Sequence, residues 1–281
     1  MITVRLKGGL GNQMFQYALG RALSIKNNTT LGLDIGFYDM NLNPKRQYDL
    51  EVFNIAGKVL EQKEIPFLYR FCHKSKILDK ITRYGFKEKS FDFDPQIFCR
   101  GSSLYIDGYW QSPKYFEDFE DEIRKDFTLK NPPVQNIEDL AKEIEHINSV
   151  CVHVRRGDYV GNKNHEIVDN EYYIKGIEYI KNHASVDKIY VFSDDIEWCK
   201  NSLKFEFSTV FVDSVYAGEK GEGHMFLMSK CKNFIIANSS FSWWAAWLSN
   251  NKEKIVICPK QWFPDKSIYT NDLIPKEWVR I

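Results

Sequence analysis

Short apolar runs alternate with amphipathic segments along the second half of this chain. The runs are rich in Val and Ile, as buried strands are, and the segments between them repeat apolar residues every three to four positions, as helices do. The expected elements are helix Ile137 to Ile147, strand Val150 to Val154, helix Glu171 to Asn182, strand Lys188 to Phe192, helix Ile196 to Leu203, strand Thr209 to Val212, helix His224 to Lys230, strand Phe234 to Ala237, helix Phe241 to Leu248 and strand Ile255 to Ile257. This alternation predicts a parallel, Rossmann-like sheet.

The first half opens on the same kind of unit and then becomes less regular. Strand Ile2 to Leu6 leads through the glycine loop Gly8 to Gln13 into a helical stripe that ends near Lys26. The further elements expected are a strand over Thr29 to Asp34, a partly helical stretch over Lys58 to Asp79, a strand within Gly101 to Trp110 and an acidic helix around Tyr115 to Phe127. The stretch Phe37 to Phe53 has no clear period.

The tripeptide Asn131-Pro132-Pro133 separates the two halves. An asparagine before two prolines is typical of a turn or linker, so we expect a domain boundary there. The pattern therefore predicts an α/β protein with two facing Rossmann-like domains, residues 1–132 and 133–281, and a cleft between them. The last segment of the chain is able to pack back onto the first domain.

Composition narrows the class of protein. The chain has 281 residues, 43% of them hydrophobic and 27% charged, with a formal net charge of zero. No global field therefore attracts nucleic acid, and an anion must be bound by local arginines. Met1 leads directly into the first strand, and no apolar run is long enough to cross a bilayer, so we expect a cytoplasmic protein. The six cysteines lack metal-site spacing, which predicts neither a disulfide nor a structural zinc.

The stretch Val150 to Tyr159 carries the strongest chemical signal. Here a buried strand is expected to end on Arg155, Arg156, Gly157 and Asp158. Ligands of open α/β sheets bind outside the carboxyl ends of the strands, and arginine offers a planar pair of donors to phosphate oxygens. We therefore expect Arg155 and Arg156 to bind a phosphate group. The alternative is a surface cluster of salt bridges on a loop.

Two other strand ends point toward the same edge of the sheet. Ser193-Asp194-Asp195 follows one strand, and Asn238-Ser239-Ser240-Phe241-Ser242 follows another just before a helix. Ser239, Ser240 and Ser242 at a helix start would present hydroxyl and backbone N–H groups to an anion. Asp194 and Asp195 would suit recognition of a base or ribose. In both places the alternative is ordinary capping of a helix.

The glycine loop and the aromatic residues carry weaker signals. Gly8 to Gln13 fits neither a P-loop nor the dinucleotide fingerprint, although Asn12 and Gln13 place uncharged polar groups at a helix start. The alternative is a glycine turn with a capping amide. Tyr109 and Trp110 are expected in a loop, as stacking platforms or as core residues. Trp243, Trp244 and Trp247 are expected to pack in the core. Asp92 and Asp94, before a proline, favour a turn over a metal site.

Five ordered motifs resemble the bacterial α-1,2-fucosyltransferases of glycosyltransferase family eleven, which are relatives of the blood-group H enzymes. The motifs are GGLGNQMFQYA at Gly8 to Ala18, GYWQS at Gly108 to Ser112, HVRRGDY at His153 to Tyr159, FSDD at Phe192 to Asp195, and ANSSFSWWAAWL at Ala237 to Leu248. The resemblance covers the chain from end to end.

The resemblance implies a GT-B-like fold with an acceptor-side domain over residues 1–132 and a GDP-fucose-binding domain over residues 133–281. It also implies metal-independent transfer of L-fucose from GDP-β-L-fucose, with inversion, to the 2-hydroxyl of a terminal galactose. The acceptor would be a galactose-terminated oligosaccharide or a lipid-linked glycan. The enzyme would then work in the cytoplasm or as a peripheral protein at the inner face of the membrane.

The resemblance also implies roles for single residues. Arg155 would bind the GDP phosphates, His153 and Asp194 would meet guanine, and Asn12 would lie near fucose and pyrophosphate. Ser240 and Ser242 would supply phosphate-binding hydroxyls, and the acceptor-side candidates are Tyr109, Trp110 and Gln111. The glutamate that acts as base in one related group is replaced by Lys163, so Asp158 is the first choice for the general base. The alternatives are His165, Glu166 and Asp169.

Two rival functions remain open. A GDP-sugar transferase of another linkage would share the donor domain and differ in the first half of the chain. A non-catalytic nucleotide-sugar-binding protein would bind GDP and need no base.

Overall fold

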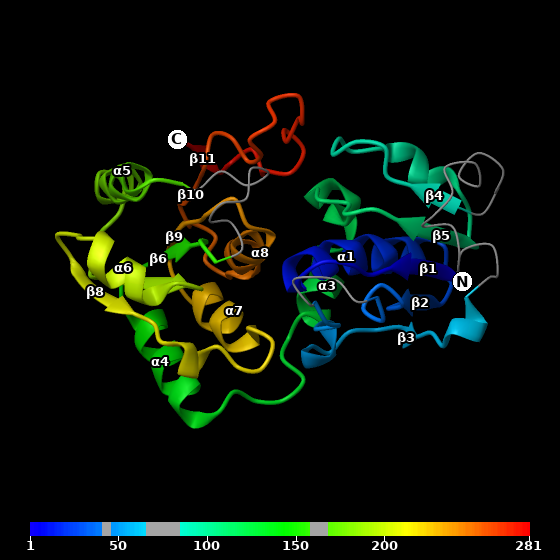
Figure 1. The fold of residues 1–281 in the computed structure, drawn as a ribbon, viewed down its shortest axis with the longest axis horizontal. Coiled ribbons are helices and arrows are strands. Elements are labelled where there is room, and N and C mark those ends of the chain that lie inside the picture. The colour runs from blue at the N-terminus through cyan, green and yellow to red at the C-terminus, as the bar shows by residue number, and fades with distance from the viewer. Residues whose placement is uncertain (41–45, 66–84, 158–167) are drawn as a thin grey trace. The chain divides into compact units, whose positions relative to one another are not determined.

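A computed structural model describes residues 1–40, 46–65, 85–157 and 168–281 of the chain. These residues form two compact units (Figure 1). Unit 1 comprises Met1–Asn131 together with Tyr269–Ile274, and unit 2 comprises Pro132–Ile268 together with Pro275–Ile281. The chain therefore passes between the units three times.

Unit 1 is built on a five-stranded parallel sheet in the order β3-β2-β1-β5-β4. The strands are β1 (Ile2–Arg5), β2 (Leu31–Asp34), β3 (Lys58–Val59), β4 (Gly85–Lys87) and β5 (Leu104–Asp107). In the central pairings, Ile2 lies opposite Leu31 on one side and Leu104 on the other. The sheet continues away from β1 in both directions, toward β2 on one side and β5 on the other.

Helix α1 (Leu10–Lys26) packs against this sheet. Most of its side chains are buried, including Met14, Phe15 and Tyr17 at 0% exposure. A Cβ atom at Gly20 would lie only 3.0 Å from Leu31 and 3.2 Å from Val4, so the glycine allows the helix to lie close to β1 and β2. The burial of α1 on nearly all sides explains why its sequence is apolar around most of its circumference.

Two expectations for unit 1 can be compared with the structure in detail. Of the stretch expected to be partly helical, Lys58 to Asp79, the described part forms β3 and a 3₁₀ helix over Gln62–Glu64, and residues 66–79 lie outside the described residues. The acidic helix is shorter than expected, because 3₁₀ turns at Pro113–Tyr115 and Glu117–Phe119 precede α3 (Glu120–Asp126). Proline at position 113 favours the first of these turns, since it fixes its own φ and lacks an N–H group.

The short C-terminal segment Tyr269–Ile274 completes unit 1. Leu273 is fully buried, and the Asp272 carboxylate accepts a hydrogen bond of 2.9 Å from the backbone N–H of Phe93. The same carboxylate forms an ion pair with the Lys114 ammonium. The segment Tyr269–Ile274 is thus held against the residues around Phe93 and Lys114, which are distant from it in sequence.

Unit 2 contains a six-stranded parallel sheet in the order β11-β10-β9-β6-β7-β8. The strands are β6 (Ser149–Val154), β7 (Lys188–Ser193), β8 (Ser208–Phe211), β9 (Asn233–Ile235), β10 (Val256–Cys258) and β11 (Val279–Arg280). Numbered from its first strand, this order is 3-2-1-4-5-6 when taken from β8, which is the Rossmann arrangement. The expected parallel, Rossmann-like sheet is confirmed.

The helices of unit 2 cover this sheet, and their positions agree with the expected ones to within about two residues. They are α4 (Gln135–His146), α5 (Asn170–Lys181), α6 (Ile196–Ser202), α7 (Glu222–Ser229) and α8 (Ser240–Leu248). Valines and isoleucines of β6 and β7 form one core cluster with Tyr173, Ile177 and Ile180 of α5. Trp243 and Trp244 are fully buried and Trp247 is 6% exposed, so the expected core role of these tryptophans is confirmed.

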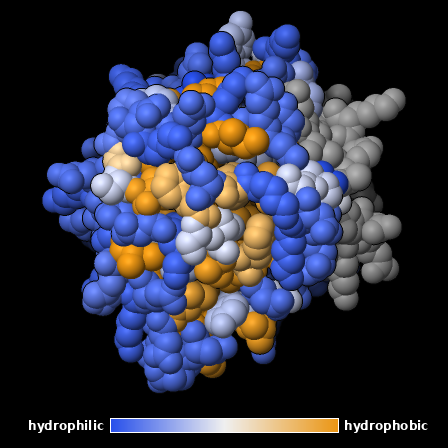
Figure 2. All heavy atoms as spheres, turned by 90° about the vertical axis from the view of Figure 1, so that its left-hand side faces the viewer, coloured by the Kyte–Doolittle hydropathy of each residue, from blue (hydrophilic) through white to orange (hydrophobic). Residues whose placement is uncertain are grey.

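Apolar side chains also reach the surface on one face of unit 2. Figure 2 shows them gathered among hydrophilic residues on the side that carries α5 and α6. Ile174 of α5 is 51% exposed, and Phe205 and Phe207 are only partly buried against the core. No helix within the described ranges is long and apolar enough to span a membrane.

Candidate active site

The carboxyl ends of β6 and β9 form the topological switch point of unit 2. These two strands pair side by side, and the sheet then continues away from them in opposite directions. Loops that leave such a point diverge and open a crevice, which is where open α/β sheets bind ligands. The loop after β6 carries Arg155, Arg156 and Gly157, and the loop after β9 carries Asn238 and Ser239. The structure therefore brings the predicted arginine and serine motifs to one edge of the sheet.

Asp194 holds the arginine loop in place from the neighbouring strand. It follows β7, and its carboxylate accepts hydrogen bonds from the backbone N–H groups of Arg156 at 2.9 Å and Gly157 at 3.0 Å. The same carboxylate pairs with Nη1 of Arg155 at 3.1 Å. A Cβ atom at residue 157 would lie 2.6 Å from the Asp194 oxygen, so this close approach requires glycine. Asp194 thus shapes the loop that presents Arg155.

Arg156 points to a different partner. Its Nε lies 3.3 Å from the Asp195 carboxylate, and its guanidinium carbon lies 3.9 Å from the centre of the Trp198 ring. Asp195 also caps α6, accepting a hydrogen bond of 3.2 Å from the backbone N–H of Trp198. The capping alternative is therefore confirmed for Asp195. Trp198 gave no signal in the sequence, because a tryptophan at the start of a helix is ordinary.

His153 lies buried beneath this loop, near the end of β6. It is 5% exposed, its Nδ1 has no hydrogen-bond partner among the described residues, and its ring lies 5.9 Å from the ring of Phe241 in α8. Burial, together with the nearby positive charge of Arg155 and with His224, lowers the pKa of His153 to about 3. The imidazole is therefore neutral, and it lies near the carboxyl end of β6.

The serine motif forms the start of α8. Ser239 is the N-cap residue, with extended backbone and no side-chain capping hydrogen bond, and Ser240 is the first helical residue. Ser242 is fully buried, and its hydroxyl donates to the backbone oxygens of Ser239 at 3.2 Å and Ala237 at 3.4 Å. The hydroxyl proton of Ser242 is thus directed at the protein backbone, while the first N–H groups of α8 lie at the carboxyl end of β9.

Unit 1 has a second switch point, between β1 and β5. The glycine loop follows β1, and the GYWQS motif follows β5. The two motifs meet in a hydrogen bond of 2.8 Å from Nε2 of Gln111 to Oδ1 of Asn12. Gln13, by contrast, is fully buried and bonds to the backbone oxygens of Gly8 and Gln47 and to Asp49, so it has a structural role.

Two aromatic candidates in this motif have different surroundings. Trp110 is 1% exposed and packs against Phe86 and Tyr115, which is the core alternative, so its ring is closed to a stacking ligand. Tyr109 is a partly exposed residue, and the Lys7 ammonium lies 4.8 Å from the centre of its ring. Tyr109 is therefore the aromatic side chain of this motif that is open to a ligand.

Glu88, which lies just after β4, was not predicted as a site residue. Its two carboxylate oxygens accept hydrogen bonds from the backbone N–H groups of Tyr109 at 2.6 Å and Trp110 at 2.7 Å. Burial raises the pKa of the Glu88 carboxyl, and the two hydrogen bonds oppose that rise. Glu88 lies in a run of charged residues, which is typical of a solvated surface, so this contact could not be predicted from the sequence.

The candidates for the general base are only partly described. Asp158, His165 and Glu166 lie outside the described residues. Asp169 is the N-cap of α5 and accepts a hydrogen bond of 2.9 Å from the backbone N–H of Tyr172. Asp169 therefore has a structural role as a helix cap. From the sequence alone, this role could not be distinguished from that of a catalytic base.

The aspartates that the sequence discounted as metal ligands have local partners. Asp94 caps a 3₁₀ turn by accepting from the backbone N–H of Gln96, and Asp92 accepts from the Ser90 hydroxyl. Within the ranges that the structure describes, His, Cys, Asp and Glu side chains form no cluster suited to a metal ion. The described cysteines are free thiols.

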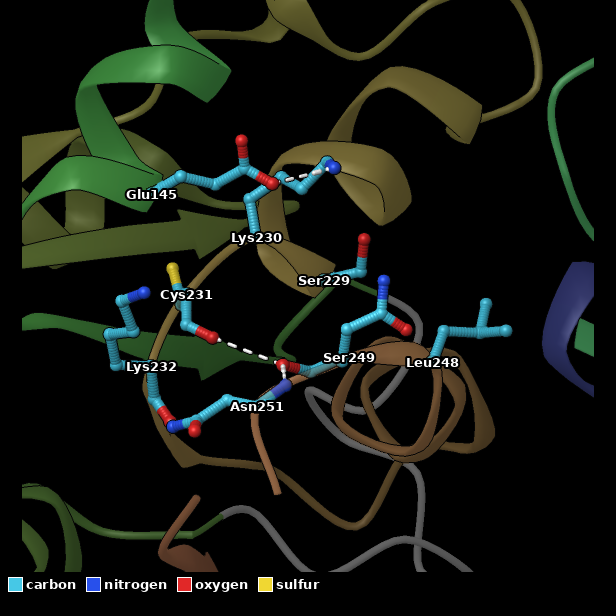
Figure 3. Close-up of a pocket in the computed structure, with 9 residues that line it drawn as sticks. Glu145, Ser229, Lys230, Cys231, Lys232, Leu248, Ser249 and Asn251 are labelled. Carbon is cyan, nitrogen blue, oxygen red and sulfur yellow. Dashed lines mark hydrogen bonds and ion pairs between the residues drawn. The ribbon is translucent and has the colours of Figure 1, made fainter. Parts of the chain in front are cut away.

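A polar cavity of about 260 Å³ lies at the opposite edge of unit 2 (Figure 3). Its lining includes Lys230 at the end of α7, Lys232 just before β9, and Ser249 after α8. Glu145 pairs with Lys230 at 2.7 Å, and the Ser249 hydroxyl donates to the Cys231 oxygen at 3.2 Å. Because it lies at the amino end of β9, this cavity is separate from the carboxyl ends of the strands, where the arginine and serine motifs lie.

Comparison with known proteins identifies the family. The family model described as glycosyl transferase family 11 matches residues 1–281. The chain belongs to this family. It is 38% identical to an α-1,2-colitosyltransferase of Escherichia coli, an alignment that covers 100% of this chain and 99% of that protein. It is 33% identical to the O-antigen biosynthesis glycosyltransferase WbnK of Escherichia coli, which covers 98% of this chain and 99% of that one.

More distant relatives include animal proteins and solved structures. A galactoside 2-α-L-fucosyltransferase of Caenorhabditis elegans is 27% identical, covering 100% of this chain and 79% of its own length. The crystal structure of the α-1,6-fucosyltransferase NodZ soaked with GDP-fucose matches with a TM-score of 0.53 at 18% identity, covering 88% of this chain and 91% of NodZ. The predicted α/β, GT-B-like fold of this family 11 glycosyltransferase is thus confirmed.

Proposed function

We propose that this protein transfers L-fucose from GDP-β-L-fucose to the 2-hydroxyl of a terminal galactose, with inversion at the anomeric carbon. The observation that carries the proposal is the loop after β6, where Asp194 holds the backbone and Arg155 lies at the switch point beside the start of α8. Family membership and the α-1,2-transferases among the relatives support the reaction class.

Colitose is the second candidate for the transferred sugar. It is fucose without the 3-hydroxyl, and the relative that is 38% identical is an α-1,2-colitosyltransferase. A site that hydrogen-bonds a hydroxyl strongly rejects the analogue that lacks it, because buried polar groups are then left without partners. The two donors should therefore differ clearly in their rates with this enzyme.

Charge stabilisation by protein groups explains how the donor is activated. As the bond between the sugar carbon and the β-phosphate oxygen breaks, negative charge builds up on GDP. Arg155 offers paired donors to the phosphate, and the N-terminal N–H groups of α8 add a partial positive charge. Arg156, held by Asp195 and Trp198, orients the loop and adds positive charge nearby.

Two residues near Arg155, His153 and Asp194, are the proposed contacts to guanine. The neutral His153, with Nδ1 lacking a protein partner, is suited to a hydrogen bond with the base. Asp194 retains acceptor capacity beyond its bonds to the loop, since each carboxylate oxygen has more than one lone pair. Asn12 and Tyr109 of unit 1 are the proposed contacts to the sugars.

The acceptor hydroxyl attacks the anomeric carbon from the face opposite GDP and gives its proton to a carboxylate or imidazole about 3 Å away. Asp158 remains the first choice for this base. We expect Asp158→Asn to keep its affinity for GDP-fucose, because the amide is nearly isosteric, and to lose about 10²- to 10⁴-fold in turnover. Calorimetry and kinetics on the same variant separate this role from one in holding Arg155 or Arg156. Normal turnover of Asp158→Asn would leave His165, Glu166 and Asp169 as the candidates for the base.

The natural acceptor is proposed to be a galactose-terminated oligosaccharide or a lipid-linked glycan. The similarity to an O-antigen biosynthesis glycosyltransferase supports a glycan under assembly as the acceptor. Such an acceptor would place the enzyme in the cytoplasm or peripherally at the inner face of the membrane.

A donor and acceptor panel tests the whole proposal. GDP-fucose and GDP-colitose are each incubated with lactose and other galactosides, and the linkage of the product is assigned by NMR. An α-1,2-linked fucoside made faster than the colitoside is the expected result. Faster colitosyl transfer would select the second candidate, and another sugar or linkage would select a rival transferase. Binding of GDP without turnover of any donor would indicate a non-catalytic binding protein.

A further inference from the structure

The turn that follows β5 in unit 1 is held by the carboxylate of the half-buried Glu88. Glu88 accepts from two successive backbone N–H groups, those of Tyr109 and Trp110, at 2.6 and 2.7 Å. Trp110 has a φ of +57°, in the left-handed region that residues with side chains rarely adopt. The carboxylate therefore stabilises a backbone conformation that this tryptophan disfavours.

Packing locks the same turn from the other side. A Cβ atom at Gly108 would lie 2.4 Å from Cβ of Glu88 and 2.7 Å from Cε2 of Trp110. The Trp110 ring is buried, with its centre 6.0 Å from that of Phe86 and 5.7 Å from that of Tyr115. Because both the backbone and the ring are fixed, the residue that follows, Gln111, has a fixed starting position.

Gln111 uses only half of its side-chain amide. It is 7% exposed, and Nε2 donates to Oδ1 of Asn12 at 2.8 Å, whereas its Oε1 is buried without a hydrogen-bond partner in the part of the chain that the structure describes. Gln16, buried in the same unit, uses both ends: Oε1 accepts from the Lys7 N–H at 2.9 Å, and Nε2 donates to the Lys7 oxygen at 3.2 Å. A buried acceptor without a partner lowers stability, and such losses persist where a function requires them.

We propose that Gln111 is a positioning residue that fixes the side-chain amide of Asn12, and that Glu88 holds the turn that aims it. Because Oδ1 of Asn12 accepts the hydrogen bond from Gln111, the orientation of the Asn12 amide is fixed, and with it the position of the Nδ2 donors. Nδ2 lies over Gly8, where a Cβ atom would come within 2.7 Å of it. This inference rests on the proposed function, in which Asn12 lies near the donor sugar and pyrophosphate. The sequence placed Gln111 among the candidates for contact with the acceptor. The role proposed here is instead to support Asn12, a proposed contact to the donor.

The first test compares activity with stability in Gln111→Met. Methionine has a similar length and no strong polar atoms, so the hydrogen bond to Asn12 and the unpartnered oxygen disappear together. We expect kcat to fall about 10- to 100-fold, as for a misplaced active-site group, while the melting temperature stays the same or rises. Gln16→Met is the buried control and should lower the melting temperature, because two backbone groups lose their partner. The exposed Gln96→Met should change neither quantity.

A double-mutant cycle tests the route of the effect. If Gln111 acts through Asn12, adding Gln111→Met to Asn12→Ala should change kcat by less than about twofold, because the effects of coupled residues do not add. Independent, multiplying effects would overturn the proposal. A lower melting temperature for Gln111→Met with unchanged kcat would overturn it as well, since Gln111 would then serve only the fold.

The proposal also has a measurement that needs no turnover. The side-chain amide resonances of Asn12 should shift in Gln111→Met and in Glu88→Gln, and they should stay in place in Gln96→Met. Unshifted Asn12 resonances in Gln111→Met would contradict the positioning role. Inactivity of the wild-type enzyme with both GDP-sugars would instead contradict the proposed function, so the two failures are distinguishable.

Discussion

Arg155 and Arg156 are neighbours in the chain, yet their guanidinium groups have different surroundings. Arg156 is held between the Asp195 carboxylate and the Trp198 ring, whereas Nη1 of Arg155 pairs with the Asp194 oxygen that also accepts the Gly157 N–H. A side chain enclosed on two sides has little freedom to follow a ligand. Arg155, at the turn beside the start of α8, is the better placed of the two to bind phosphate.

Substitution by lysine separates the two arginines. We expect Arg155→Lys to lose about 10²- to 10³-fold in turnover, because an ammonium cannot reproduce the paired donors of a guanidinium on a phosphate. Arg156→Lys keeps the charge and should reduce turnover far less. Initial rates with GDP-fucose, together with calorimetric titration of GDP, check both variants. Near-normal turnover of Arg155→Lys beside a severe loss in Arg156→Lys would reverse the assignment.

The neutral state of His153 gives stability a pH dependence. Its pKa is about 3 in the folded protein, below the ordinary value of 6.5, so the unfolded chain binds a proton across this interval that the folded protein does not. Stability should therefore fall as the pH drops below about 6.5, by at most about 1.4 kcal/mol per pH unit from this group. Urea unfolding at pH 7.5 and pH 5 should show a smaller loss in His153→Gln than in the wild type. Equal losses would mean that His153 is not the group responsible.

Helix α5 begins on one of the candidate bases, and its stability provides a way to separate the two roles. Asp169 accepts from the backbone N–H of Tyr172, and such a cap contributes about 1 kcal/mol. We expect Asp169→Ala to lower the free energy of unfolding by about that amount, and Asp169→Ser, which can still cap, to lower it less. Turnover per folded molecule should be unchanged in both. A large loss of turnover in Asp169→Ser would instead indicate that the carboxylate takes the acceptor proton.

How much could be predicted from the sequence depends on the length of each element. The strand β6 and the helix α5 were expected within about one residue, because six or more residues suffice to show a period. The strands β3, β4 and β11 have two or three residues each, and pairing with a neighbouring strand specifies them rather than any local pattern. The strand ends that carry Arg155 and Asp194 could be predicted from the sequence. The contacts of Glu88 and Trp198 could not, because they depend on tertiary packing.

Charge balance applies to the whole molecule. Lysine and arginine together number 38, equal to aspartate and glutamate, so the net charge neither attracts nor repels a nucleotide sugar. The counter-charge for a leaving diphosphate must then be local. In the proposed function, Arg155, Arg156 and the start of α8 would supply it at one edge of unit 2.

We therefore expect turnover to be independent of added divalent ions. Arginine and helix N–H groups can stabilise the charge on GDP without a metal ion. Initial rates in the presence of a chelator should equal those with magnesium or manganese. Activity that is abolished by the chelator and restored by a divalent ion would contradict this expectation and return attention to Asp92 and Asp94.

The triple passage of the chain between the units constrains how the enzyme can be recombined with its relatives. A chimera joined once near Asn131 would pair one parent's Phe93 and Lys114 with the other parent's residue at position 272, and so disturb an anchor inside unit 1. Trimming the last thirteen residues would remove both that anchor and the edge strand β11 of unit 2. Exchange of the two units between parents therefore requires three junctions, with the six residues Tyr269–Ile274 taken from the same parent as Met1–Asn131.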